Sequence, residues 1–410
     1  MARIVVKFGG TSVADVDRIK DAALRIKAEA DAGTEVVAVV SAMAGVTNQL
    51  VALTNQMGAL FDAREYDAIV ATGEQSNAGL MALALQTLGV QARSWLGWQI
   101  PIRTDGVHGK ARITGTETDE LERRLGTGEV AVVAGFQGLG PDGRITTLGR
   151  GGSDLTAVAL AGALGAERCD IYTDVDGIYT SDPRIVAKAK KLAYVTYEEM
   201  LEMASLGSNV LQTRSVELAM KHGVRIQVRS AFSGAPGTFV VNEDEIVEQQ
   251  IVEQQIVSGI SDSKDDAKIT LLRVADRPGV AAGIFGPLAE AAINVDMIVQ
   301  NVSEDGKTDL TFTVGKSDLE MAAGLLRDNQ AKIGYDELIQ DADVVKVSVV
   351  GVGMRSHAGV AQKMFQTLAD KGINIQVITT SEIKVSVLIA GEYGELAVRA
   401  LHTAYGLDGD

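Results

Sequence analysis

The 410-residue chain is poor in cysteine and aromatic residues and has no surplus of positive charge. Cys169 is the only cysteine, so no disulfide can form within the chain and a reducing compartment is expected. Aromatic residues make up 4% of the sequence and the formal net charge is −16. Both values disfavour a nucleic-acid-binding protein, because few rings are available to stack on bases and phosphates are repelled on average. An anionic substrate would have to be met by a local cluster of cations and N–H groups.

The signatures of metal sites and of membrane or secreted proteins are also missing. The four histidines are scattered, and no His/Cys cluster has the spacing of a zinc site, so no metal ligands are predicted. No apolar run approaches the length of a membrane span, and the N-terminus lacks a secretory segment. The sequence therefore predicts a cytoplasmic protein without membrane partners.

What the chain does contain is typical of a compact α/β protein: 46% hydrophobic residues and 44 glycines against 6 prolines. Its length favours two or three domains. Up to about residue 240, short β-branched runs alternate with amphipathic helical stretches, which predicts a mostly parallel sheet covered by helices on both faces. Strands are expected at 3–7, 35–41, 129–135, 170–173 and 224–229, and helices at 16–32, 48–57, 77–88, 155–164 and 210–221.

The character of the sequence changes near residue 242, and an internal repeat follows. The unit I-V-E-Q-Q occurs twice between 246 and 255 and is interpreted as a linker or an edge strand. Segments of seventeen residues that begin at Gly279 and Gly359 then share eight identical positions. The β runs around each copy predict twin ferredoxin-like β-α-β-β-α-β modules. We expect one large domain over 1–245 and two modules over 260–340 and 341–410. A strand from 246–259 could join the second module.

Three glycine-rich segments lie where strands of the first domain end. In K-F-G-G-T-S, Lys7 precedes its glycines, unlike the Walker pattern, and the alternatives are an anion nest or a tight turn. In T-T-L-G-R-G-G-S-D, from residue 146, Arg150 is placed to grip a carboxylate or phosphate, although the last two residues would also serve as a helix cap. The third, from Ile171 to Arg184, would cover a nucleotide or form a hydrogen-bonded turn.

Two further segments lie beside these, S-A-M-A-G-V-T-N from Ser41 and A-T-G-E-Q from Ala71, and each taken alone resembles a helix cap. No Ser–His–Asp set and no dinucleotide fingerprint is present. Together the parts favour phosphoryl transfer. If the acceptor is a carboxylate, it is already ionised and needs no general base, so catalysis reduces to positioning and charge neutralisation by Lys, Arg, N–H groups and Mg²⁺.

These motifs resemble the aspartate kinase family. The resemblance rests on K-F-G-G-T-S, V-S-A-M-A-G-V-T-N, T-G-E-Q, T-T-L-G-R-G-G-S-D and Y-T-D-V-D-G-I-Y-T-S-D-P-R, in that order. The twin modules resemble the family's regulatory ACT domains, the second with G-M-R-S-H and T-S-E-I-K. The resemblance implies an amino-acid kinase fold followed by two ACT domains, ATP and Mg²⁺ as cofactors, and phosphorylation of the L-aspartate β-carboxylate at the start of lysine, threonine and methionine biosynthesis. It also implies feedback inhibition by lysine, threonine or both, and a homodimer or larger assembly through the ACT domains.

Carried over position by position, the resemblance implies catalytic roles for Lys7, at the transferring phosphoryl group, and for Asp154, which would orient Lys7. Glu74 would face the ammonium group of aspartate, and Arg150 its α-carboxylate. The residues implied to bind aspartate are Ser41, Thr47, Glu74, Arg150, Gly151, Gly152 and Ser153. Those implied to line the nucleotide are Lys7, Phe8, Gly9, Gly10, Thr173, Asp174, Tyr179, Thr180, Ser181, Asp182, Pro183, Arg184 and Asn209.

The implied effector site has a part in each module. In the first module it comprises Asp276, Gly279, Val280, Ala281, Asn294, Asp296, Gln300 and Asn301. In the second it comprises Met354, His357, Gly359, Val360, Asn374, Ile375, Thr380, Ser381 and Glu382. The chain departs from the family at Asn209, where a lysine near the nucleotide is usual. A kinase for another amino acid and a non-catalytic lysine or threonine sensor with a decayed kinase domain are the alternatives.

Overall fold

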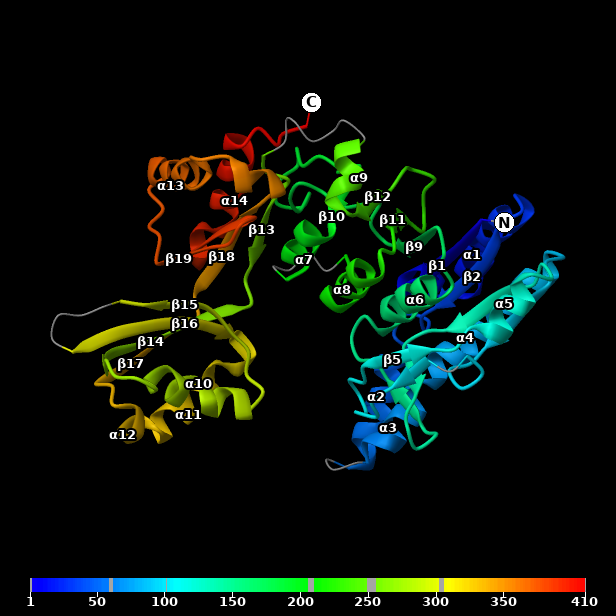
Figure 1. The fold of residues 1–410 in the computed structure, drawn as a ribbon, viewed down its shortest axis with the longest axis horizontal. Helices are drawn as coiled ribbons and strands as arrows, with labels where there is room; N and C mark the ends of the chain where they lie inside the picture. Colours follow the sequence, from blue (N-terminus) through cyan, green and yellow to red (C-terminus); the bar gives the residue numbers. More distant parts are fainter. Residues whose placement is uncertain are drawn as a thin grey trace. The chain divides into compact units, whose positions relative to one another are not determined.

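The computed structural model describes residues 2–58, 62–100, 102–205, 210–248, 256–301 and 306–409. The described residues fall into two compact units. The N-terminal unit contains residues up to 178, 191–204 and 210–248, and the C-terminal unit contains 179–190 and the residues from 256 onward. In Figure 1 the first runs from blue to green, and the second is chiefly yellow to red.

An eight-stranded sheet in the order β10-β12-β11-β9-β1-β2-β6-β3 forms the centre of the N-terminal unit, and all its neighbours are parallel except β11 and β12. The strand order turns about β1, so the carboxyl ends of β1, β2, β6 and β9 converge where open α/β sheets bind ligands. The strands are β1 (Arg3–Phe8), β2 (Glu35–Val40), β3 (Ala92–Trp95), β6 (Val130–Ala134), β9 (Arg168–Thr173), β10 (Tyr194–Thr196), β11 (Ile226–Ser230) and β12 (Thr238–Val241).

Helices cover both faces of this sheet. Ile4, Val6 and Phe8 of β1 pack with apolar residues of α1 and α4, whereas α6 contacts β1, β2 and β9. Because side chains alternate along a strand, Lys7 lies on the face opposite Phe8, which is the face that α6 covers. The helices are α1 (Val16–Asp31), α2 (Val46–Met57), α3 (Ala63–Val70), α4 (Thr72–Thr87), α5 (Asp119–Leu125), α6 (Gly152–Ala163), α7 (Tyr197–Ser205), α8 (Thr213–His222) and α9 (Glu243–Glu248).

A second, smaller sheet in the order β5-β4-β7-β8 extends from the carboxyl end of β6. Its strands are β4 (Ile102–Thr104), β5 (Ile113–Thr116), β7 (Gln137–Leu139) and β8 (Ile145–Thr147). β8 is an edge strand that pairs only with β7 among the strands described here. It leads directly into the Gly-Arg-Gly-Gly loop and α6.

The first repeat module is a four-stranded sheet in the order β15-β16-β14-β17. This is the strand order of a ferredoxin-like β-α-β-β-α-β unit. Its elements are β14 (Asp266–Ala275), α10 (Val280–Glu290), β15 (Val295–Gln300), β16 (Lys307–Gly315), α11 (Leu319–Asp328), α12 (Gln330–Ile333) and β17 (Glu337–Asp341). The three helices lie on one face of the sheet (Figure 1), and side chains of all three pack into its core.

The second repeat module has the same layout with one change of connection. Its sheet has the order β13-β18-β20-β19, and its fourth strand, β13 (Gly259–Ser263), comes from the chain before the first module. β13 pairs antiparallel with β18, from Gly259 opposite Val350 to Ser263 opposite Lys346. The remaining elements are β18 (Val344–Val350), α13 (Val360–Asp370), β19 (Val377–Thr380), β20 (Lys384–Ala390) and α14 (Gly394–Ala404).

The two modules contact each other through apolar and charged side chains. Met297 and Val344 belong to a shared apolar cluster. Lys346 of β18 lies 3.2 Å from Asp266 and 2.9 Å from Asp296 of the first module. Burial opposes the charge of Lys346, but the two carboxylates outweigh it and raise the pKa of its ammonium group.

A short segment from the middle of the chain completes the core of the second module. Val186 packs in that core, and the Thr180 carbonyl accepts a 2.8 Å bond from the Ile260 N–H. The Thr180 hydroxyl lies 2.8 Å from His402 Nε2, and His402 Nδ1 lies 2.9 Å from the Asp408 carboxylate. Residues 179–190 therefore belong structurally to the C-terminal unit.

The predicted fold class is confirmed: a mostly parallel α/β sheet is followed by two ferredoxin-like modules. The expected strands and helices are present, with ends displaced by a few residues, the largest being α4, which begins at Thr72 rather than 77. The small sheet, strands β3, β10 and β12, and helices α3, α5, α7 and α9 are not among the elements expected from the sequence. The duplicated I-V-E-Q-Q falls mostly outside the described residues.

Candidate active site

Lys7 and Asp154 form a buried ion pair at the carboxyl end of β1. The Lys7 ammonium lies 2.6 Å from Asp154 Oδ1, and the two side chains are 11% and 9% exposed. Asp154 is in the first turn of α6, whose cap residue, Gly151, contributes no side-chain hydrogen bond. The Asp154 carboxylate thus reaches from α6 to Lys7 on the face of the sheet that this helix covers.

The residues after Lys7 expose backbone at the same edge. Gly9 donates to the Tyr172 carbonyl at 3.1 Å, and a short 3₁₀ turn over Gly10–Val13 follows. Phe8 and Tyr172 stack with their ring centroids 4.7 Å apart, which locks the ends of β1 and β9 together. A lysine beside two consecutive glycines at this position is suited to bind an anion.

Glu74 reaches the same edge from the first turn of α4. It is 4% exposed, and its Oε1 accepts a 3.1 Å bond from the Ala42 N–H, next to Ser41. Asn77, one turn later, donates to the Ser41 carbonyl at 2.6 Å. A Cβ on Gly73 would lie 2.8 Å from the Ala42 Cβ, so glycine allows α4 to approach the loop this closely.

The second oxygen of Glu74 has no hydrogen-bond partner among the described residues. Burial raises the pKa of Glu74 from 4.5 to about 7, against the opposing effect of the Ala42 N–H. A buried, half-satisfied carboxylate is matched by a cationic ligand group.

Arg150 lies at the tip of a turn that Gly149 and Gly152 close with a 3.0 Å backbone hydrogen bond. Its side chain is exposed, and no hydrogen bond or ion pair joins it to the described residues. Gly151 has a φ of +68°, and a Cβ there would lie 2.2 Å from Gln212 Cγ, so this turn requires glycine. Arg150 is thus a cation presented on a tightly built loop.

The predicted nucleotide residues divide between the two units. Thr173 ends β9 in the N-terminal unit and Asp174 follows it, and the Thr173 hydroxyl donates to Asp174 at 3.1 Å. Tyr179 to Arg184 belong to the C-terminal unit. There the exposed Arg184 pairs with Asp182 at 2.7 Å, and hydrogen bonds from Arg184 hold the pKa of Asp182 below its ordinary value. Asn209 lies outside the described residues.

Comparison with known proteins identifies the family. Residues 2–230 match the amino acid kinase family, and residues 268–329 and 347–405 match ACT domains. An aspartate kinase of Stutzerimonas stutzeri is 54% identical over 409 residues, covering 100% of this chain and 98% of that protein. An aspartokinase of Pseudomonas aeruginosa is 54% identical over 410 residues, with the same coverage. The chain belongs to the aspartate kinase family.

Solved structures of aspartate kinases have the same fold. Escherichia coli aspartokinase III in complex with aspartate and ADP has a TM-score of 0.78 at 28% identity, covering 98% of this chain and 99% of that one. The same enzyme in complex with lysine and aspartate gives 0.76 at 28% identity, with 98% of each chain covered. This chain is therefore similar to an aspartate kinase over its whole length, regulatory modules included.

The effector residues expected of an aspartate kinase lie at matching places in the two modules. Gly279 and Gly359 cap α10 and α13, with φ of +89° and +99°. Asp296 and Gln300 lie on edge strand β15 of the first module, and Thr380 ends edge strand β19 of the second. Val280 and Val360 are buried at the starts of α10 and α13, and Met354 and Ile375 are partly buried. The remaining residues are exposed: Asp276, Ala281, Asn294, Asn301, His357, Asn374, Ser381 and Glu382.

Three residues that shape this aspartate kinase site were missed in the sequence. Phe136 has a φ of +70° where β6 passes into β7, and its carbonyl accepts from the Leu148 N–H at 2.9 Å. Arg214 of α8 donates to the Leu148 carbonyl at 2.6 Å. Asp67 is a fully buried carboxylate on α3. Each acts through long-range contacts that carry no local sequence signal.

Proposed function

We propose that the chain transfers the γ-phosphoryl group of ATP to the β-carboxylate of L-aspartate, giving β-aspartyl phosphate and ADP. The observation that carries the proposal is the buried Lys7–Asp154 pair at the carboxyl end of β1, beside Gly9 and Gly10. The naming of full-length relatives as aspartate kinases supports it, as does the complex of aspartokinase III with aspartate and ADP.

In this reaction a β-carboxylate oxygen attacks the γ-phosphorus, and the bond from that phosphorus to the bridging oxygen of ADP breaks. The acceptor is ionised before it reacts, so no general base is needed. The barrier comes mainly from bringing two anions together, so positioning and charge neutralisation supply the catalysis. Lys7 neutralises the transferring group and is held in place by Asp154.

Recognition of the amino acid is assigned to two side chains, Glu74 and Arg150. Glu74 would accept from the ammonium group through its unpartnered oxygen, and Arg150 would bind the α-carboxylate with its forked guanidinium. The proposed aspartate-binding set is Ser41, Thr47, Glu74 and residues 150–153, and the proposed nucleotide-lining set is residues 7–10, Thr173, Asp174, residues 179–184 and Asn209.

The acidic side chains of the candidate site suit a Mg²⁺ ion that is bound mainly by nucleotide phosphates and water. In the described ranges there is no group of three or more His, Cys, Asp or Glu side chains arranged to hold a metal, and Mg²⁺ commonly binds through substrate phosphates with few protein ligands. When bound, the ion would supply positive charge at the β- and γ-phosphates. Asp174, exposed after β9, is the candidate to reach its water shell.

We further propose regulation through the ACT modules by lysine, threonine or both, in a homodimer or larger assembly. The complex of aspartokinase III with lysine supports lysine as an effector class. The proposed boundaries are 1–245 for the kinase domain and 260–340 and 341–410 for the ACT domains. The product would enter lysine, threonine and methionine biosynthesis in the cytoplasm. Across the described residues, no helix is long and apolar enough to span a membrane.

Trapping of the product tests the proposal. Incubation with ATP, Mg²⁺, L-aspartate and hydroxylamine is expected to give aspartyl hydroxamate together with stoichiometric ADP. Lys7→Ala is the matched control and is expected to abolish the hydroxamate. The absence of hydroxamate above a no-enzyme control, at saturating substrates, would refute the proposed reaction.

A further inference from the structure

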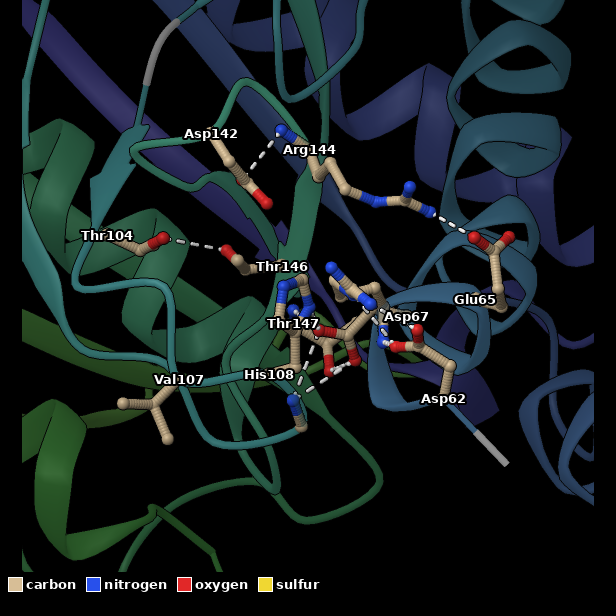
Figure 2. Close-up of polar contacts among 12 residues, drawn as sticks. Asp62, Glu65, Asp67, Thr104, Val107, His108, Asp142, Arg144, Thr146 and Thr147 are labelled. Atoms are coloured by element: carbon tan, nitrogen blue, oxygen red, sulfur yellow. Dashed lines mark hydrogen bonds and ion pairs between the residues drawn. The ribbon is translucent and has the colours of Figure 1, made fainter. Parts of the chain in front are cut away.

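Asp67 of α3 is the centre of a buried hydrogen-bond cluster that none of the roles above uses. Its exposed fraction is 0%. Oδ1 accepts from the Thr147 hydroxyl at 2.5 Å and the Gly109 N–H at 3.1 Å. Oδ2 lies 2.7 Å from His108 Nδ1 and accepts from the N–H groups of Thr147 at 3.0 Å and Gly109 at 3.1 Å. Figure 2 shows the carboxylate between His108 and Thr147.

The cluster supplies a hydrogen-bond acceptor at the edge of the small sheet, where no further strand is described beside β8. Thr147 ends β8, an edge strand whose only described strand partner is β7, so its N–H would be left unbonded in the interior. Asp67 accepts that N–H in place of a further strand. An unbonded buried N–H is costly, so the carboxylate fixes where β8 ends.

Asp67 thereby fastens two distant chain segments to each other. On one side, Thr147 is followed by Leu148, Gly149 and then Arg150. On the other, α3 ends at Val70, and α4 begins at Thr72 and carries Glu74 in its first turn. Asp67 therefore precedes Glu74 closely in the sequence, and its hydrogen-bond partner Thr147 precedes Arg150 closely. These are the two groups assigned to bind the amino-acid backbone.

The opposite side of the Arg150 loop has its own anchor. Arg214 donates to the Leu148 carbonyl at 2.6 Å and to the Ala111 carbonyl at 2.9 Å. Ala111 in turn donates its N–H to the Thr147 carbonyl at 2.9 Å. With Arg214 on one side and Asp67 on the other, the start of the loop is fixed at consecutive residues.

We propose that Asp67 is a positioning residue for substrate recognition, which sets the separation between Glu74 and Arg150. The ammonium and α-carboxylate of an amino acid are a fixed distance apart, so two rigid binding groups must match that distance to act together. The inference rests on the proposed function, because it uses the roles given there to Glu74 and Arg150. Loss of the cluster should weaken aspartate binding and spare ATP binding, since Lys7 and Gly9 have no bond to it.

Thr147→Val is the most direct test, because it removes one hydroxyl donor and keeps the shape, the charge and the backbone N–H. A hydrogen bond to a charged group is worth about 1.5–3 kcal/mol, so the KM for aspartate should rise by about 10-fold or more. The KM for ATP should stay within about twofold. Thr147→Ser, which keeps the hydroxyl donor, should have the native KM for both substrates. Asp67→Asn, which sets an amide NH₂ against the same donors, should have a larger effect of the same kind.

Glu65→Gln is the matched control. Glu65 is on the same helix and pairs with Arg144 of the β7–β8 turn at 2.5 Å, but both side chains are exposed and neither touches Thr147 (Figure 2). It should leave the KM for aspartate unchanged. If the cluster only stabilised the fold, the Thr147 and Asp67 variants would have lower thermal stability and a smaller active fraction. The KM for aspartate would then not rise relative to the KM for ATP.

Calorimetric titrations of aspartate and of a non-hydrolysable ATP analogue complete the test. Selective loss of aspartate affinity in Thr147→Val, restored in Thr147→Ser, supports the positioning role. Unchanged aspartate affinity, or equal loss for both ligands, overturns it even if Asp67→Asn does not fold. A native chain that fails to bind aspartate or to form hydroxamate instead refutes the proposed function, which is a different pattern of results.

Discussion

Glu74 is a carboxylate whose surroundings oppose its charge. Burial raises its pKa to about 7 from 4.5, so near neutral pH about half of the ligand-free protein carries a proton there. Because the folded-state pKa lies above the unfolded one, the stability that this group contributes is greatest below pH 4.5 and is lost as the pH rises through about 7. The contribution of Glu74 to the free energy of unfolding differs by about 3 kcal/mol between pH values below 4.5 and above about 7.

The same shift makes substrate binding depend on pH. An ammonium group beside Glu74 favours the ionised form, so aspartate should displace a proton near pH 7. The KM for aspartate should fall up to about tenfold per unit as the pH rises from 6 toward 7 and level off above about 8. Calorimetry at pH 7 in two buffers of different ionisation enthalpy measures the released proton. Native protein that releases none, or releases as much as Glu74→Gln, would contradict the assignment.

Arg150 gives a second prediction at the same scale. A lysine at 150 keeps the charge but loses the fork that binds both carboxylate oxygens. Arg150→Lys should therefore lower kcat/KM for aspartate by about 10- to 100-fold, the equivalent of about 1–3 kcal/mol. The KM for ATP should stay within about twofold. Steady-state kinetics with each substrate varied in turn measures this, and equal losses for both substrates would move Arg150 to the nucleotide side.

Some residues of the site could be predicted because their neighbours in the sequence indicate their role. Lys7 stands beside its glycines, and Arg150 stands among three of them. Asp67 could not be found, because it is one acidic residue in an ordinary helix and its partners lie at 108–109 and 147. Phe136 could not be found either, because a positive φ in a non-glycine residue is imposed by packing and leaves no mark in the sequence.

Among whole elements, the long parallel strands were predictable and the short ones were not. β1, β2 and β6 are runs of buried β-branched residues, which a fully covered strand requires. β4, β7 and β8 have three residues each, and β4 joins β7 through the single pair Arg103 and Leu139. Such strands are defined by their neighbours rather than by a pattern of their own.

The repeated helix starts lead to a prediction at this scale. Gly279 and Gly359 leave the first N–H groups of α10 and α13 without a side-chain cap, so each helix start offers donors to an amino-acid carboxylate. Ser381→Phe and Asp276→Ala alter exposed positions of the proposed effector site and should relieve inhibition by lysine or threonine about tenfold or more. Activity without effector should change less than about twofold.

Titration of activity with each amino acid, singly and together, measures the effect. Glu392→Gln, an exposed change in the turn before α14, serves as the control and should keep full sensitivity. Native protein that neither amino acid inhibits at millimolar concentration would contradict effector binding at these helix starts. Full sensitivity of Ser381→Phe to both would do the same.

On the scale of the whole molecule, the chain does not keep catalytic and regulatory parts in separate stretches. Residues 179–184, proposed to line the nucleotide, fold as part of the C-terminal unit. Thr180 and His402 are both buried and lie 2.8 Å apart. The core of the second module thus holds Thr180, one of the residues proposed to line the nucleotide, and we propose this link as a route from the module to ATP binding.

His402→Leu tests that route. It removes one hydrogen-bond partner of the Thr180 hydroxyl and one of Asp408, and it substitutes an apolar side chain of similar size. The Thr180 hydroxyl keeps the Lys190 N–H as a donor, and Asp408 keeps the Thr403 hydroxyl. The KM for ATP should rise about threefold to tenfold, and the KM for aspartate should change less than twofold, since about 1 kcal/mol is lost per neutral hydrogen bond. Thr403→Val, which touches only Asp408 at an exposed position, is the control and should leave both values unchanged. An unchanged KM for ATP in His402→Leu would contradict the route.

The position of β13 limits where a separate regulatory polypeptide could begin. The second module needs Gly259–Ser263 as its fourth strand, so a chain that starts later exposes the backbone edge of β18 and invites pairing with other chains. No methionine lies between Met220 and Met297, and Met297 is inside β15, after both β13 and β14. Translation initiated at Met297 would therefore yield a fragment without β13 and β14, which is expected to aggregate. A product with both sheets complete needs an initiation codon upstream of Gly259.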